Sequence, residues 1–240
     1  MGMTRSIGGQ AGGADLSALP LDDVDLSSGW TLLDPDALIK TLGVAAGVHS
    51  FTLNGLGVGS TNYAWSSGTT HRAPRWYKPL LNSAGQPITS DDRFVLITEM
   101  IYAAPGTQYA GEVVFGVCTD PTSLTSAGME GHGAHMNMNL SGGPNMGTWT
   151  LNSATASNNT GTTYLRNICW GWNQRIGPGS YLTFNGSDEQ LNNGSRNPNI
   201  ARASGQALYL MVGVGTNGSA TIVDGSDIKA SFKHAILQAA

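Results

Sequence analysis

The sequence predicts an all-β protein, an antiparallel β-sandwich of jelly-roll type with long loops. Three observations predict this class. Apolar residues recur mostly at every second position, which is the period of a half-buried strand. The chain has 33 glycines and many Ser, Thr and Asn residues, which favour turns over helices. Only 12% of its residues are charged, and its 240 residues suit one large sandwich.

Two units are expected along the chain. Residues 1–27 are rich in Gly, Ala and Asp, which is typical of an extended N-terminal arm lying on the same subunit or on a neighbour. Residues 28–240 then form a single β-sandwich domain. We expect no signal peptide and no membrane span, because the N-terminus lacks an apolar stretch and no window approaches about 18 apolar residues.

One short helix is expected after a first strand at residues 29–33. Asp34 is a typical N-cap residue, and Pro35 is favoured at the first helical position. The turn of residues 37–42 would end at Gly43, which allows two helical turns at most.

The strongest strand signals lie in the middle of the chain. Residues 93–103 and 112–119 flank Ala104-Pro105-Gly106, which predicts an antiparallel hairpin with Ala103 opposite Glu112. Both faces of this hairpin are apolar, so we expect it to be central and covered on both sides.

Further strands follow from alternation and from the turn residues between them. They are expected at residues 49–53, 163–173, 180–185, 206–216, 220–223 and 228–236. Three polar stretches are expected to be long loops, at residues 57–92, 120–162 and 186–205.

The residue patterns of catalytic and metal sites are weak. Glu99 and Glu112 share a face of the predicted hairpin but are not opposite each other, which disfavours a glycosidase pair. His132 and His135 could ligate a metal, but their glycine neighbours favour a flexible contact loop. We therefore expect no enzyme, no metal site and no cofactor.

The charge of the chain argues against one class of partner, and its two cysteines leave two possible redox states. The net charge is −4 and the chain has no run of Lys or Arg, which argues against nucleic-acid binding. Cys118 and Cys169 lie in apolar, strand-like runs. Two buried reduced thiols are the first interpretation, and a disulfide is the alternative.

Two aromatic groups are candidates for contact with a ligand or a partner. The first shares one face of a predicted strand, and we interpret it as core or interface, with a sugar platform as the alternative. The second lies in a loop-rich region, where we expect Arg–aromatic stacking between subunits. The first group is Tyr164, Arg166, Trp170 and Trp172, and the second is Arg75, Trp76 and Tyr77.

Residues 30–53 (WTLLDPDALIKTLGVAAGVHSFTL) resemble virion proteins of tailed bacteriophages. Residues 207–216 and 228–237 resemble the last strands of concanavalin-like sandwiches, in which the first and last strands pair within one sheet. That resemblance implies that residues 30–33 lie beside the C-terminal strand. The chain departs from the lectins of this fold in lacking an evident calcium site, and from its hydrolases in lacking paired acids. No active residue is therefore carried over.

These observations predict a non-enzymatic structural protein of a virion, such as a capsid decoration, head-fibre or tail component assembled in the host cytoplasm. We expect it to contact other virion proteins and itself, as a homo-oligomer for which a trimer is the first expectation. The alternative is a carbohydrate-binding adhesin that recognises a cell-surface glycan.

Overall fold

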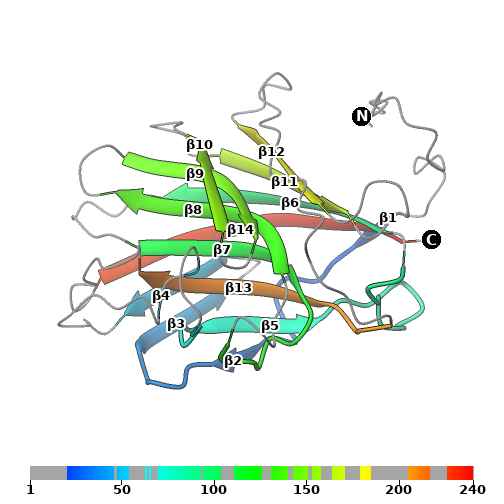
Figure 1. Ribbon diagram of the computed structural model, residues 1–240, viewed down its shortest axis with the longest axis horizontal. Helices are drawn as coiled ribbons and strands as arrows, with labels where there is room; N and C mark the ends of the chain where they lie inside the picture. The colour runs from blue at the N-terminus through cyan, green and yellow to red at the C-terminus, as the bar shows by residue number, and fades with distance from the viewer. Residues whose placement is uncertain are drawn as a thin grey trace.

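The computed structural model describes residues 21–45, 48–53, 63, 65, 70–92, 94–103, 111–125, 131–139, 143–150, 153–157, 164–170, 179–184, 205–216 and 226–239. In this part of the chain the strands form two seven-stranded antiparallel sheets, packed as two layers, and no α-helix is present (Figure 1). The prediction of an antiparallel β-sandwich is therefore confirmed.

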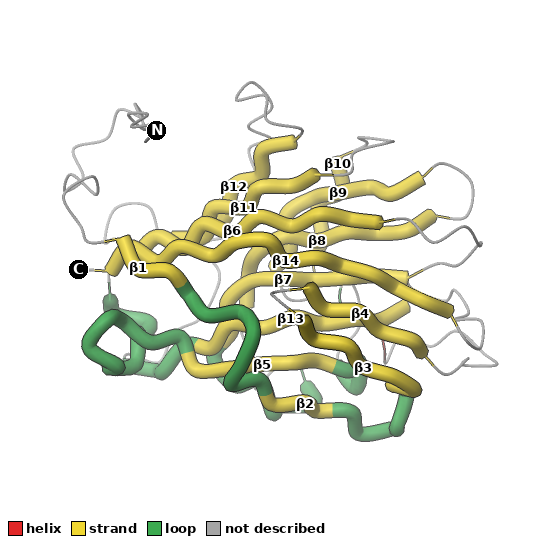
Figure 2. The backbone as a smooth tube through the Cα atoms, turned by 180° about the vertical axis from the view of Figure 1, so that it is seen from behind, coloured by secondary structure: helices red, strands yellow, loops and turns green. Residues whose placement is uncertain are grey.

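Sheet A is the layer that contains the C-terminal strand. Its strands are β1 (Leu21–Asp23), β3 (Ile39–Ala45), β4 (Val48–Leu53), β6 (Phe94–Ala103), β11 (Tyr164–Trp170), β12 (Gly179–Phe184) and β14 (Ser226–Ala239). Their order is β12-β11-β6-β14-β4-β3, and β1 also pairs with β14. The view from behind shows β14 running through the middle of this layer (Figure 2).

Sheet B is the second layer. Its strands are β2 (Thr31–Leu33), β5 (Arg75–Pro79), β7 (Gly111–Cys118), β8 (Gly131–Asn139), β9 (Gly143–Thr150), β10 (Ser153–Ser157) and β13 (Tyr209–Thr216). Their order is β10-β9-β8-β7-β13-β5-β2.

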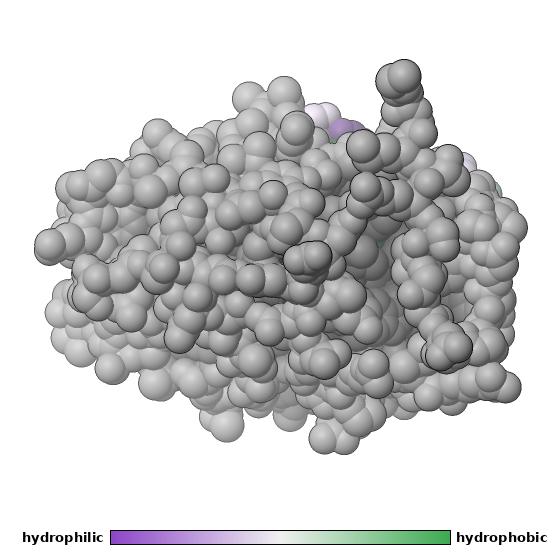
Figure 3. Space-filling model, turned by 90° about the horizontal axis from the view of Figure 1, so that it is seen from above, coloured by the Kyte–Doolittle hydropathy of each residue, from purple (hydrophilic) through white to green (hydrophobic). Residues whose placement is uncertain are grey.

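Among the residues whose side chains the structure describes, buried positions cluster along β7 and β13 of sheet B. Both faces of these strands are covered, since Phe115 and Val114 alternate on β7 and neither has any exposed surface. Met211 and Val212 repeat this pattern on β13. Seen from above, the few surface atoms of the described residues are mainly hydrophilic or neutral (Figure 3).

The predicted hairpin of residues 93–103 and 112–119 is wrong. Both segments are strands, but β6 pairs with β11 and β14 in sheet A, whereas β7 pairs with β8 and β13 in sheet B. Residues 104–110 separate them, which is enough chain to pass between layers about 10 Å apart. Since both segments are apolar on both faces, each needs two strand neighbours and cover on both sides.

The predicted helix is also wrong. Asp34 does cap the backbone, because its carboxylate accepts hydrogen bonds from the amides of Leu38 (2.9 Å) and Ile39 (2.8 Å). However, Ala37 adopts a left-handed conformation with φ of 52°, which stops a right-handed helix after a single turn. The β-branched residues that follow then enter β3.

The N-terminal strand pairs differently from the prediction. Residues 31–33 form β2, which pairs with β5 in sheet B and not with the C-terminal strand. The strand beside β14 is β1, with Leu21 opposite Gln238. The first and last described strands therefore pair in one sheet, but the first one lies in the segment that was expected to be the arm, of which residues 1–20 lie outside the described residues.

Residues 24–30 carry the chain from sheet A to sheet B. The Lys78 ammonium holds this crossing, because it donates to the carbonyls of Asp25 (2.6 Å) and Ser28 (2.8 Å). The same ammonium lies 5.7 Å from the ring centre of Trp30. The indole of Trp30 in turn donates to the Leu26 carbonyl at 2.8 Å.

Two of the three expected loops contain strands. Residues 57–92 include β5, and residues 120–162 include β8, β9 and β10. Residues 186–204 and the expected strand at 220–223 lie outside the described residues. The strands β8 and β9 consist largely of Gly, His, Met and Asn, which have little strand preference of their own and are held by their neighbours in the sheet.

Candidate functional site

Arg75, Trp76 and Tyr77 lie on β5, between β13 and β2 of sheet B. Arg75 and Trp76 have no exposed surface, so they offer nothing to a partner subunit. Tyr77 is half-buried and packs edge-to-face on Tyr209, with 6.0 Å between the ring centres. The expected loop placement of this group is corrected, because its side chains belong to an internal strand.

The Arg–aromatic contact expected between subunits forms inside the chain. The Arg75 guanidinium lies 5.1 Å from the ring centre of Trp65, and Trp65 stacks on His71 at 5.9 Å between centres. Arg75 also donates to the His71 carbonyl at 2.6 Å. Burial lowers the pKa of Arg75 to about 10, so it stays a cation at neutral pH.

Two glycines of β13 make room for this cluster. A Cβ atom on Gly213 would lie 2.5 Å from the Trp65 ring, and one on Gly215 would lie 2.1 Å from the Tyr63 carbonyl oxygen. Trp65 can therefore lie flat on the strand only because residue 213 has no side chain. We call residues 63, 65 and 70–74 the covering segment, because it lies over this face of β13 and β7.

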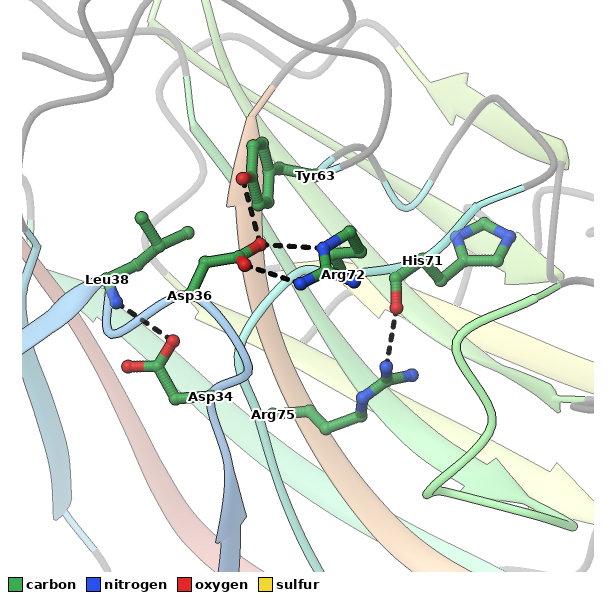
Figure 4. Close-up of polar contacts among 7 residues, drawn as sticks. All are labelled: Asp34, Asp36, Leu38, Tyr63, His71, Arg72 and Arg75. Atoms are coloured by element: carbon green, nitrogen blue, oxygen red, sulfur yellow. Dashed lines mark hydrogen bonds and ion pairs between the residues drawn. The ribbon is translucent and has the colours of Figure 1, made fainter.

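An ion pair joins the covering segment to the turn between β2 and β3. The Asp36 carboxylate accepts two hydrogen bonds from Arg72, at 2.8 and 2.5 Å, and one from the Tyr63 hydroxyl at 2.9 Å (Figure 4). The Arg72 hydrogen bond holds the pKa of Asp36 below its ordinary value. Burial, with Asp36 beside it, raises the pKa of Tyr63.

Cys118 is a free, buried thiol, as expected for this residue. It packs in the same cluster as Trp65, Val114 and Met211. Burial raises the pKa of Cys118 to about 12, so almost no reactive thiolate forms at neutral pH. Cys169 lies on β11 in the other sheet.

The register of sheet A brings three of the first group of candidates to one face. Tyr164 is opposite Ile101, Arg166 is opposite Glu99, and Trp170 is opposite Val95. Trp172 lies outside the described residues. The alternation that predicted a shared face for residues 164, 166 and 170 is consistent with this register.

Several of the other residues on this face of β12, β11, β6 and β14 are apolar, beside polar positions such as Gln238, Ser231 and Thr183. The neighbouring positions Phe94 and Leu96 are on the opposite face and are almost fully buried, at 2% and 0% exposure. We call the first face the association face. It is defined by Val95, Ile97, Ile101, Tyr164, Ile168, Trp170, Tyr181 and Ile236, which the strand register places in neighbouring positions.

One row of ionisable residues crosses the association face. Arg166 of β11 is opposite Glu99 of β6, which is opposite His234 of β14. Sequence reasoning singled out Arg166 and Glu99 but missed His234 as their neighbour. The alternation of residues 228–236 was visible, but a β-bulge between Phe232 and His234 shifts the register, and no sequence pattern marks it.

The structure does not bring the two candidate acids together, and it does not bring the two candidate histidines together. Glu99 and Glu112 lie in different sheets, so the face that they were expected to share does not exist. His132 and His135 lie on β8, not in a loop, and their spacing puts them on opposite faces. Among the described residues no group of three potential metal ligands is found.

The described residues contain no helix long and apolar enough to cross a membrane. No protein-family model matches the chain, and no curated protein matches it.

Several solved structures have a similar shape. The carbohydrate recognition domain of Emp47p shares 11% identity and a TM-score of 0.49, covering 95% of this chain and 99% of that one. An alginate lyase of Pseudomonas aeruginosa shares 13% identity and a TM-score of 0.47, over 90% of this chain and 100% of that one. The CBM2 module of the evolved Dit protein of Lactobacillus casei BL23 phage J-1 shares 9% identity and a TM-score of 0.44, over 92% and 97%. Likeness at this level describes a shared shape only.

Proposed function

We propose that this chain is a non-enzymatic structural component of a virus particle, a capsid decoration, head-fibre or tail protein, that acts by packing the association face against another protein. The observation that carries the proposal is the register of β12, β11, β6 and β14. It places Tyr181, Ile168, Ile97 and Ile236 in one cross-strand row on the face opposite Leu96.

The physical argument is the position of these residues. In a sandwich with one core, the outer face of a sheet usually carries polar residues. An apolar cross-strand row on an outer face is typical of a surface that another protein covers, because burying it removes apolar area from water. The low charge of the chain supports the same function, since few charged groups must be desolvated on association.

In this proposal the first partner is a second copy of the chain. Residues on this face belong to four neighbouring strands, so a face-to-face contact could extend across the sheet. The protein would reach its place in the virion in the host cytoplasm, with other virion proteins as further neighbours.

The test is an Ile97→Glu substitution, which places a charge in the middle of the row. We expect the intact chain to be an oligomer by light scattering, and the variant to shift towards monomer with an unchanged far-ultraviolet circular dichroism spectrum. The control is Ser83→Glu, which adds the same charge at an exposed turn. An intact chain that is monomeric at high concentration, or a variant that associates normally, contradicts the proposal.

The second candidate is a carbohydrate-binding adhesin that uses Tyr164, Arg166 and Trp170. The shared face of these residues on β11 favours it. Their position among apolar neighbours ranks it below association. A glycan array tests it, because Trp170→Ala should abolish binding without loss of folding.

A further inference from the structure

Strand β2 forms one edge of sheet B and is exposed to solvent. It is the last strand in the order of that sheet, pairs only with β5 among the described strands, and lies at the lower border of the molecule in Figures 1 and 2. Thr31 is exposed, and Leu32 keeps 41% of its surface exposed. An exposed edge strand presents backbone groups that can pair with another chain.

The hydrogen bonds between β5 and β13 show which way the backbone of β5 points. The Val214 amide donates to the Pro74 carbonyl at 3.0 Å, and the Leu80 amide donates to the Leu208 carbonyl at 2.9 Å. Both bonds continue the register of these two strands. Because successive residues of an antiparallel strand point their N–H and C=O groups alternately to either side, Trp76, two residues after Pro74, also points to β13.

The backbone of Leu32 therefore points away from the sheet. The two residues beside Trp76 point to β2, where they are opposite Thr31 and Leu33. These are the pairs that exchange hydrogen bonds between β2 and β5. Leu32 is opposite Trp76, so its N–H and C=O face the open edge. The edge thus offers a donor and an acceptor at one residue, which also has an exposed apolar side chain.

The side chains of β2 do not block this edge. Native sheets protect an open edge with a charged side chain, a proline or a bulge on the edge strand. Strand β2 consists of Thr, Leu and Leu, and it pairs with β5 without a shift in register. Gly29, with φ of 76°, and the turn that begins at Asp34 limit the straight segment to residues 30–34.

The edge is complementary to itself. A two-fold axis at Leu32 pairs β2 antiparallel with the β2 of a second copy, so that the two Leu32 residues exchange both backbone hydrogen bonds and their side chains meet on one face. Alternation puts Trp30 and Asp34 on that face too, with Trp30 of each copy opposite Asp34 of the other. The Lys78 ammonium lies 5.7 Å from the Trp30 ring centre. A cation of one copy therefore meets a carboxylate of the other at both ends of the contact.

We propose that β2 binds the β2 of a second copy of this chain and joins sheet B of the two copies into one continuous antiparallel sheet. Any strand can form the backbone bonds, but the charged ends match an identical partner in this register. The contact does not rest on the association face, which belongs to sheet A. A chain that uses both contacts forms assemblies larger than a dimer.

Amide hydrogen exchange of the intact chain, followed by NMR at a series of protein concentrations, tests the direction of the backbone groups. The amides of Thr31 and Leu33 should be protected at every concentration, because they bond to β5. The Leu32 amide should exchange fast in dilute protein and about tenfold or more slowly in concentrated protein. A Leu32 amide that exchanges at the same rate throughout overturns the inference.

Substitutions at the two-fold axis test the partner. Leu32→Lys places two ammonium groups face to face, and we expect it to raise the dissociation constant of the dimer by about tenfold or more in analytical ultracentrifugation. Leu81→Lys is the matched control, because it makes the same change at an exposed leucine in a separate turn and should leave association unchanged. Leu32→Pro removes the outward N–H, which an edge strand tolerates, and should weaken association as well.

Circular dichroism and melting curves establish that each variant folds. A folded Leu32→Lys variant that associates like the intact chain overturns the inference, whatever Ile97→Glu does. Association that is lost in Ile97→Glu alone assigns the contact between copies to sheet A and overturns it too. Loss in Leu32→Lys alone supports β2 and counts against the association face instead.

Discussion

Gly213 and Gly215 decide how the covering segment meets sheet B. The Trp65 ring lies where a side chain of residue 213 would be, and it holds Arg75 and His71 in one buried cluster. An arginine without exposed surface is expensive to desolvate, and this one is compensated by the Trp65 ring and the His71 carbonyl. The cluster is therefore a structural element that fixes the covering segment.

We expect Gly213→Ala to destabilise the fold by about 1–3 kcal/mol, because the added methyl group forces the buried Trp65 ring to move. Urea denaturation measures this free energy of unfolding. A Trp65→Leu background is the control, since a smaller side chain leaves room for the methyl group. Equal destabilisation in both backgrounds would contradict the clash as the cause.

At the scale of elements, the turn between β2 and β3 shows that a helix-capping residue in the sequence does not guarantee a helix. Asp34 makes the amide contacts that predicted a helix start, yet one left-handed residue, Ala37, redirects the chain into β3. An alanine in this conformation is strained, because its Cβ lies close to the following carbonyl.

We expect Ala37→Gly to stabilise the protein by roughly 0.5–1 kcal/mol. Glycine adopts this conformation without strain, and this gain in free energy exceeds the loss caused by the greater conformational freedom of glycine in the unfolded chain. Thermal melting provides the measurement. The matched control is Ala84→Gly, an exposed turn residue without a positive φ, where only the loss in the unfolded chain applies. A lower melting temperature for Ala37→Gly would show that the turn tolerates its alanine.

The strands that the sequence predicts well are those with a clear alternation of branched or large apolar residues, such as β4, β6 and β14. The strands β8 and β9 could not be predicted from the sequence, because their Gly, His and Asn residues have little strand preference of their own. They form strands because they pair with neighbours that are far away in the sequence. The sequence also does not predict which strands pair with each other. The face shared by Tyr164, Arg166 and Trp170 follows from alternation alone, but the residues opposite them follow from tertiary structure.

At the scale of the whole molecule, the Asp36–Arg72 pair bridges the edges of the two layers. Asp36 lies in the turn between β2 of sheet B and β3 of sheet A, and its partners Arg72 and Tyr63 belong to the covering segment. The contact therefore joins three parts of the fold, although its partly exposed position makes it sensitive to salt.

This pair predicts a stability that decreases in acid. The pKa of Asp36 is lowered in the folded state, so its contribution is present above its ordinary value of 3.8 and is lost as the pH falls through the folded pKa. We expect melting temperatures from pH 7 to pH 2 to fall less steeply for Asp36→Asn than for the unmodified chain. Identical slopes would mean that other carboxylates account for the acid sensitivity.

The position of β14 has a consequence for how the molecule folds. This strand follows every other described strand in the sequence, yet it lies between β6 and β4 and also receives β1. During synthesis on a ribosome, sheet A would therefore remain in two separate halves, with unsatisfied backbone groups along both, until its last strand emerges. Such long-range closure favours slow folding, and it makes the half-made chain prone to aggregate before completion.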